Sequence, residues 1–219
     1  MHSKTTLLFS NIVGDVKEKC ENLTFNTYMQ QYLKNEVKEK SNLLFINANG
    51  LGGEENYLNN ILVCFKNIGI EFESVFNLDN NSQTEELENF IKKDNLIIFL
   101  MGGNPYTQME LIKKFNLVNF IKEYNGLVIG FCAGALNLSK HSIITTDEDF
   151  LTPDVYDGIG RVSIVVESHY NDESDIKRNK ELETFSKQLK QKIYAIPDES
   201  MIVIENEKLT EYGKIYYFE

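Results

Sequence analysis

The chain has 219 residues, of which 42% are hydrophobic and 25% charged, a composition typical of a soluble globular protein long enough for one α/β domain. Its formal net charge of −11 disfavours nucleic acid and anionic membranes as partners. The three scattered cysteines form no disulfide framework, and neither a signal-peptide core nor an apolar run of membrane-spanning length is present. We therefore expect a single domain over residues 1–219 in the cytoplasm.

Apolar runs alternate with amphipathic segments along the first 140 residues. We expect strands near 7–13, 43–48, 72–76, 96–100 and 127–130, separated by helices near 25–39, 54–65, 84–93 and 105–124. This alternation predicts parallel βαβ units in a three-layer α/β sandwich with a mostly parallel central sheet. Further on, we expect strands at 142–146 and 162–166, a helix at 174–190, and short antiparallel strands at 193–196, 201–204 and 214–218.

Residues 127–134 read Leu-Val-Ile-Gly-Phe-Cys-Ala-Gly, an apolar strand that breaks into a small-residue turn before a helix. Gly-x-Cys-x-Gly between a strand and a helix is the thiol form of a nucleophile elbow, which exposes the central side chain at the strand's carboxyl end. A helix N-terminus favours the thiolate form of such a cysteine. Cys132 is therefore the candidate nucleophile, and the alternative is a buried structural cysteine.

A nucleophilic thiol needs a base, a group that orients the base, and donors for an oxyanion. His169 follows an apolar strand, whereas His2 is terminal and His141 lies near the end of the elbow helix. Asp147 or Asp149 could orient His169. The backbone amides of Gly103 and Ala133 are the expected oxyanion donors.

Five segments of the chain resemble segments of peptidase family S51, the dipeptidase E and cyanophycinase group. They are Met101-Gly102-Gly103-Asn104, Gly130 to Leu138 with Asp147 after it, Asp157 to Gly160, Ser168-His169-Tyr170 and Ile196-Pro197-Asp198-Glu199. The resemblance runs along nearly the whole chain in the same order. It implies a class I glutamine amidotransferase-like, flavodoxin-like sandwich and a hydrolase of small peptides.

By position in these motifs, the resemblance implies that Cys132 is the nucleophile, His169 the base, Asp147 the orienting acid and Asn104 a substrate-binding residue. The family has serine where this chain has Cys132. The family also uses an arginine downstream of the histidine to hold a substrate aspartate. In this chain only Lys177 or Arg178 falls near that place, so a preference for aspartate stays open.

Two other functions share the elbow motif. A glutamine amidotransferase would add a C-terminal His-x-Glu pair, which His169-Tyr170-Asn171 does not supply. A redox sensor of the DJ-1 type would oxidise its elbow cysteine without hydrolytic turnover. Gly50-Leu51-Gly52-Gly53 lacks the spacing of a dinucleotide or phosphate loop. We expect a peptidase with a small peptide substrate and no cofactor or metal; a homodimer, and the choice of Asp147, Asp149 or Glu199 beside His169, stay open.

Overall fold

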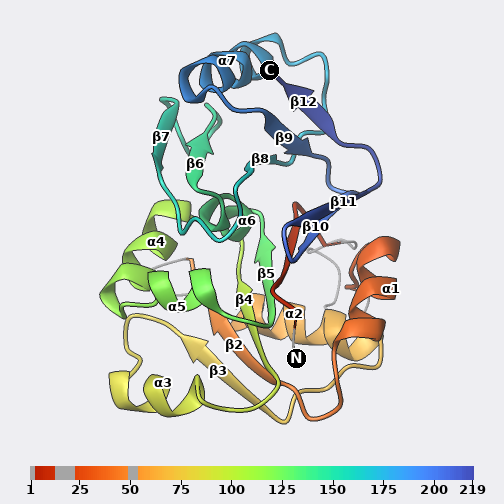
Figure 1. Cartoon of the computed structure of the whole chain (residues 1–219), viewed down its shortest axis with the longest axis vertical. Coiled ribbons are helices and arrows are strands. Elements are labelled where there is room, and N and C mark those ends of the chain that lie inside the picture. Colours follow the sequence, from red (N-terminus) through yellow and green to blue (C-terminus); the bar gives the residue numbers. More distant parts are fainter. Residues whose placement is uncertain (1–2, 13–22, 49–53) are drawn as a thin grey trace.

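The computed structural model, drawn in Figure 1, describes residues 3–12, 23–48 and 54–219. Its strands are β1 (Thr5–Phe9), β2 (Asn42–Ile46), β3 (Ser74–Leu78), β4 (Leu96–Leu100), β5 (Leu127–Phe131), β6 (His141–Ile144), β7 (Asp154–Asp157), β8 (Val165–Ser168), β9 (Ile193–Ile196), β10 (Met201–Glu205), β11 (Lys208–Tyr212) and β12 (Tyr216–Phe218). Its helices are α1 (Thr27–Glu36), α2 (Glu54–Asn67), α3 (Thr84–Phe90), α4 (Pro105–Lys114), α5 (Val118–Glu123), α6 (Ala133–Leu138) and α7 (Ile176–Leu189). The glycine-rich turn at residues 50–53 lies outside the described residues, as does Cys20.

A mostly parallel sheet lies at the centre of the described part of the chain. Its strand order is β11-β10-β1-β5-β4-β2-β3. The five strands β1 to β5 run parallel to one another, β10 pairs antiparallel with β1, and β11 pairs antiparallel with β10. Two smaller sheets, β12-β9-β8 and β6-β7, lie above it in Figure 1. The predicted α/β fold with a mostly parallel sheet and short antiparallel strands is confirmed.

Both faces of the central sheet are covered, because alternate side chains of its strands enter two separate cores. In β2, Leu43 and Phe45 pack in the core under α1 and α2, whereas Leu44 and Ile46 pack in the core that includes α3 to α6. All four side chains are fully buried. A parallel strand covered on both faces needs such an unbroken apolar run, which is why the sequence pattern predicts these strands well.

Some boundaries differ from those predicted from the sequence. The helix expected over 105–124 is two helices, α4 and α5, because Asn116 adopts a left-handed conformation (φ 54°) between them. The strand expected at 162–166 is β8, which begins at Val165 and continues to Ser168. Strands β7 and β11 were not expected from the sequence.

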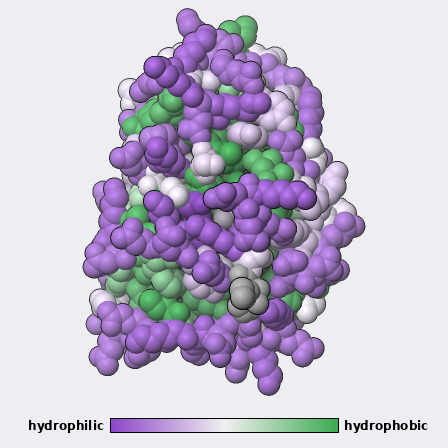
Figure 2. All heavy atoms as spheres, viewed as in Figure 1, coloured by the Kyte–Doolittle hydropathy of each residue, from purple (hydrophilic) through white to green (hydrophobic). Residues whose placement is uncertain are grey.

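The carboxyl ends of four strands carry the candidate site residues. The turn at 101–104 follows β4, Cys132 follows β5, His169 follows β8 and Asp198 comes two residues after β9. The face in Figure 2 is mostly hydrophilic, in keeping with the net charge. Within the described ranges, no helix has the length and apolarity needed to cross a bilayer.

Candidate active site

Cys132 lies at a sharp turn between β5 and α6. Its backbone is strained, with φ 49° and ψ −110°, as in a nucleophile elbow. The N–H of Cys132 donates to the carbonyl oxygen of Phe9 (2.9 Å), and its own carbonyl accepts from Ala135 and Leu136 at the start of α6. These bonds fix the turn on both sides of the thiol.

The glycines of the elbow are required by close packing. A Cβ on Gly134 would lie 2.2 Å from the carbonyl oxygen of Leu100, and one on Gly130 would lie 2.8 Å from the Cα of Ala135. Backbone atoms cannot move away from such contacts without shifting β4 or α6. The motif therefore brings α6 against the end of β4, which places Cys132 beside the 101–104 turn.

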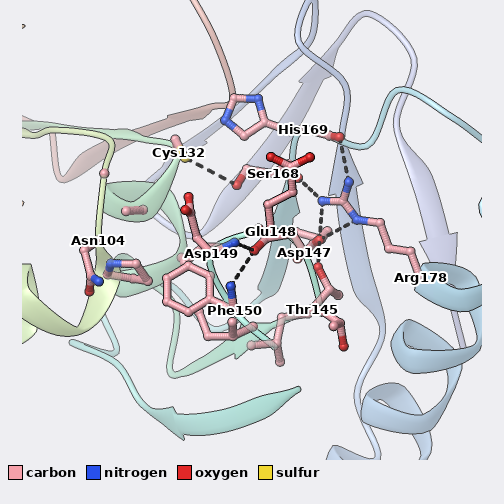
Figure 3. Close-up of a pocket in the computed structure, with 18 of the residues that line it drawn as sticks. Asn104, Cys132, Thr145, Asp147, Glu148, Asp149, Phe150, Ser168, His169 and Arg178 are labelled. Carbon is pink, nitrogen blue, oxygen red and sulfur yellow. Dashed lines mark hydrogen bonds and ion pairs between the residues drawn. The ribbon is translucent and has the colours of Figure 1, made fainter. Parts of the chain in front are cut away.

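The imidazole of His169 hydrogen-bonds the Asp198 carboxylate on one side and lies beside the Cys132 sulfur on the other, near enough for each to shift the pKa of the other. The distance from His169 Nδ1 to Asp198 Oδ1 is 2.7 Å, so Nε2 is the ring nitrogen that faces the sulfur. His169 also has a positive φ (56°), which turns its side chain toward the elbow. Figure 3 shows the ring beside Cys132.

Asp198, which the sequence analysis did not assign a role, is held in place by Asn171. The Asn171 side-chain amide donates to Asp198 Oδ2 (2.7 Å), and the Asp198 backbone N–H donates to Asn171 Oδ1 (2.9 Å). The parallel pairing of β8 with β9, in register Ser168 to Ile196, brings the two segments together. The resemblance of residues 196–199 to a family segment was the sequence signal that could have identified this carboxylate.

Asp147 does not contact His169 in the structure, contrary to the role expected from the sequence. Its Oδ1 accepts the backbone N–H groups of Asp149 (2.8 Å) and Phe150 (2.7 Å), and so closes a turn of its own loop. Asp147 and Asp149 both line the cavity in front of Cys132. The structure therefore replaces Asp147 with Asp198 as the carboxylate on His169.

The Cys132 thiol and the His169 imidazole stabilise each other's charged forms. Burial raises the pKa of the Cys132 thiol, but hydrogen bonds from His169, Ser168 and the Gly103 amide, together with the charge of His169, leave this pKa below its usual value. Burial lowers the pKa of His169, but its bonds to Asp198 and Cys132 raise it to about 10. Both shifts favour a thiolate–imidazolium pair over a neutral thiol beside a neutral imidazole.

The turn after β4 supplies a backbone donor beside the sulfur. The backbone N–H of Gly103 helps to lower the pKa of the Cys132 thiol, and Gly103 has φ 128°, a conformation in which any other residue would be strained. Ala133 follows the nucleophile at the first position of α6, where a backbone N–H has no partner within the helix. The structure thus places both predicted oxyanion residues next to Cys132. Asn104 caps α4 through its side-chain oxygen, which accepts from the N–H groups of Tyr106 and Thr107.

A cavity of about 970 Å³ opens in front of Cys132. Its walls come from residues 103–105, the loop at 143–150, the end of β8 and the start of α7. Among the charged side chains that line it are Glu148, Asp149 and Lys177 (Figure 3 labels the first two). In the described part of the chain, no three His, Cys, Asp or Glu side chains group as a metal site.

Comparisons with known proteins agree with this geometry. The model of peptidase family S51 matches residues 7–212. A crystal structure of a presumptive peptidase E protein from Listeria monocytogenes EGD-e matches with a TM-score of 0.63 and 17% sequence identity, over 97% of this chain and 99% of that one. Among proteins with curated functions, none matched the sequence. Since the family model spans nearly the whole chain, this protein belongs to peptidase family S51.

Proposed function

We propose that this protein is a thiol peptidase that cleaves small peptides, with Cys132 as the nucleophile, His169 as the general acid and base, and Asp198 as the orienting carboxylate. The observation that carries the proposal is the chain of contacts from the Cys132 sulfur through the His169 ring to Asp198. A nucleophile, its base and a carboxylate behind the base are the parts that acyl transfer needs. The cavity volume of about 970 Å³ is in the range of small-ligand pockets.

In the proposed reaction, the thiolate attacks the carbonyl carbon of the scissile amide and forms a C–S bond. The negative charge moves to the carbonyl oxygen, where the Gly103 and Ala133 amides can donate to it. The C–N bond then breaks while the His169 imidazolium gives its proton to the leaving amine. Water attacks the thioester with His169 accepting its proton, the C–S bond breaks, and the acid product and the thiolate are released.

The test is turnover of a dipeptide library followed by mass spectrometry of the intact protein, with Cys132→Ala and Cys132→Ser alongside. The proposal requires hydrolysis by the unaltered protein, its loss in Cys132→Ala, and an acyl adduct that maps to Cys132. Hydrolysis by Cys132→Ser without any by the unaltered protein would overturn the thiol mechanism and leave a serine-type scaffold silenced by its own cysteine.

A second function, peroxide sensing, is favoured by the lowered pKa of Cys132. In that reaction the thiolate attacks one oxygen of hydrogen peroxide and the O–O bond breaks, the His169 imidazolium gives its proton to the leaving hydroxide, and a sulfenic acid and water are formed. Sulfenate formation at Cys132 at low peroxide concentration, together with no peptide turnover in the library assay, would favour this function over the peptidase.

A further inference from the structure

One guanidinium group holds three consecutive residues at the end of β8. Arg178 Nε donates to Glu167 Oε1 (2.8 Å), and Nη1 donates to the carbonyl oxygen of His169 (2.9 Å). Nη2 donates both to the Glu167 carboxylate and to the carbonyl oxygen of Ser168. These contacts, drawn as dashed lines in Figure 3, engage the guanidinium through all three of its nitrogens.

The position of Arg178 is itself fixed by a buried partner. The side chain of Glu167 is 3% exposed, and Thr145 donates its hydroxyl to Oε1 (2.7 Å). A carboxylate buried in this way needs an opposite charge, and Arg178 provides it. At the other end of the side chain, the backbone N–H of Arg178 donates to the Asp175 side chain, which caps α7 (3.0 Å).

His169 needs such support because its backbone is in the left-handed region (φ 56°), where any residue other than glycine is strained. Arg178 donates to the carbonyl oxygens of Ser168 and His169, which belong to the two peptide bonds on either side of the His169 Cα. A displacement of these carbonyls would turn the His169 ring away from Cys132. Errors of about 1 Å in such a pair can cost on the order of 100-fold in rate.

We infer that Arg178 is a positioning residue, which with Glu167 holds His169 in reach of the Cys132 thiol, and that it does not bind the substrate. The inference rests on the Cys132–His169 pair of the proposed function. It assigns to the guanidinium a role in the protonation of the thiol, since only a correctly placed imidazolium can stabilise the thiolate.

The test compares Arg178→Lys with a matched control, Arg161→Lys. Arg161, the other arginine of the sequence, is buried, and it donates to one hydroxyl and four backbone carbonyl oxygens near the amino ends of β1 and β5, away from Cys132. Lysine keeps the charge in both variants but cannot reproduce the planar fork of donors. Both substitutions should therefore lower stability, and only the first should affect the site.

The main readout is the rate of Cys132 alkylation by iodoacetamide against pH, at a temperature where circular dichroism shows each variant folded. For Arg178→Lys we expect the apparent pKa of the thiol to rise by about one unit or more, which lowers the alkylation rate about tenfold at pH values below the thiol pKa of the unaltered protein. With a peptide substrate, kcat should fall about tenfold while KM stays within about twofold. Arg161→Lys should leave both profiles unchanged.

Two results would overturn the inference. One is an unshifted alkylation profile in Arg178→Lys, which would make Arg178 a structural residue only. The other is a rise in KM for acidic peptides with kcat retained, which would make it a substrate-binding residue. If Arg178→Lys does not fold, the double substitution Glu167→Gln with Arg178→Gln removes both buried charges together and gives the same comparison. The alkylation profile decides even if no peptide is turned over, so a failure of the peptidase proposal would be recognised separately.

Discussion

Replacement of Asp198 by asparagine tests whether Asp198, as the structure indicates, or Asp147, as expected from the sequence, is the carboxylate that orients His169. The new amide cannot satisfy both of its neighbours. If its oxygen still accepts from His169 Nδ1, its NH₂ group faces the side-chain NH₂ of Asn171, which the backbone N–H of residue 198 holds in that orientation. If the amide rotates, its NH₂ group points at Nδ1 and forces the proton of the neutral ring onto Nε2, away from the tautomer that a base needs.

The size of the effect follows from the pKa of His169. Burial lowers this pKa, and the Asp198 hydrogen bond is the largest of the contributions that raise it to about 10. An opposite charge at this range is worth about one to three pKa units, and each unit changes the population of the thiolate–imidazolium pair about tenfold. Together with the loss of ring orientation, we expect kcat/KM to fall by about 10²–10³, within the range for general acid–base groups.

The assay is peptide hydrolysis by Asp198→Asn, with Asp147→Asn as the control. The control also removes one carboxylate charge from the neighbourhood of the cavity, but its side chain closes only its own turn. Asp147→Asn should therefore retain kcat/KM within about threefold. A larger loss in Asp147→Asn than in Asp198→Asn would refute the assignment of Asp198 and restore the one expected from the sequence.

Three further predictions follow from the site and its frame. Alkylation of Cys132 by iodoacetamide, followed by peptide mapping, should slow less between pH 8 and pH 6 than alkylation of an ordinary thiol, because the pKa of Cys132 is lowered, whereas an ordinary thiol falls to about 0.3% ionised at pH 6; a pH profile equal to that of a free cysteine would refute this. Gly134→Ala should lower the free energy of unfolding in urea by about 3 kcal/mol, because its Cβ would lie 2.2 Å from a backbone carbonyl oxygen of β4. The control Gly69→Ala should lower it by about 1 kcal/mol, because its Cβ would meet no atom within 4 Å and only its φ of 82° is strained. Equal losses in the two variants would contradict the packing argument. Aspartyl dipeptides should be hydrolysed no faster than alanyl dipeptides. The Arg178 guanidinium is already hydrogen-bonded to Glu167 and to the His169 carbonyl oxygen, and the carboxylates at 147–149 line the cavity and would repel a substrate aspartate. A tenfold preference for aspartate would refute this.

The sequence predicts the frame of the molecule well, because the frame depends on local patterns. Runs such as residues 43–46 and 96–100 are apolar throughout, and only a strand covered on both faces buries such a run completely. The elbow is also local, since Gly130, Cys132 and Gly134 lie within five residues. Its position after a strand predicted that Cys132 would stand at the carboxyl edge of the sheet, and the structure places it there.

The orienting carboxylate depended on information that a single sequence does not show locally. Asp198 reaches His169 only because β8 and β9 pair in parallel, and that pairing joins segments 28 residues apart in the register Ser168 to Ile196. Asp147 was the expected acid because of its position in the segments that resemble the family. In the structure, the backbone N–H groups of the loop that follows Asp147 donate to the Asp147 side chain, and the Asp-x-Asp pattern of residues 147–149 is a local sequence sign of such a turn.

The two residues proposed to react, Cys132 and His169, both have positive φ values, 49° and 56°, although neither is a glycine. Glycine would relieve the strain at either position but would remove the side chain that the chemistry requires, so the surroundings must hold both conformations. For Cys132 they do so through Phe9 of the neighbouring strand and the first turn of α6. For His169 they do so through Arg178, which is why a residue outside the line from sulfur to carboxylate is expected to control the ionisation of the thiol.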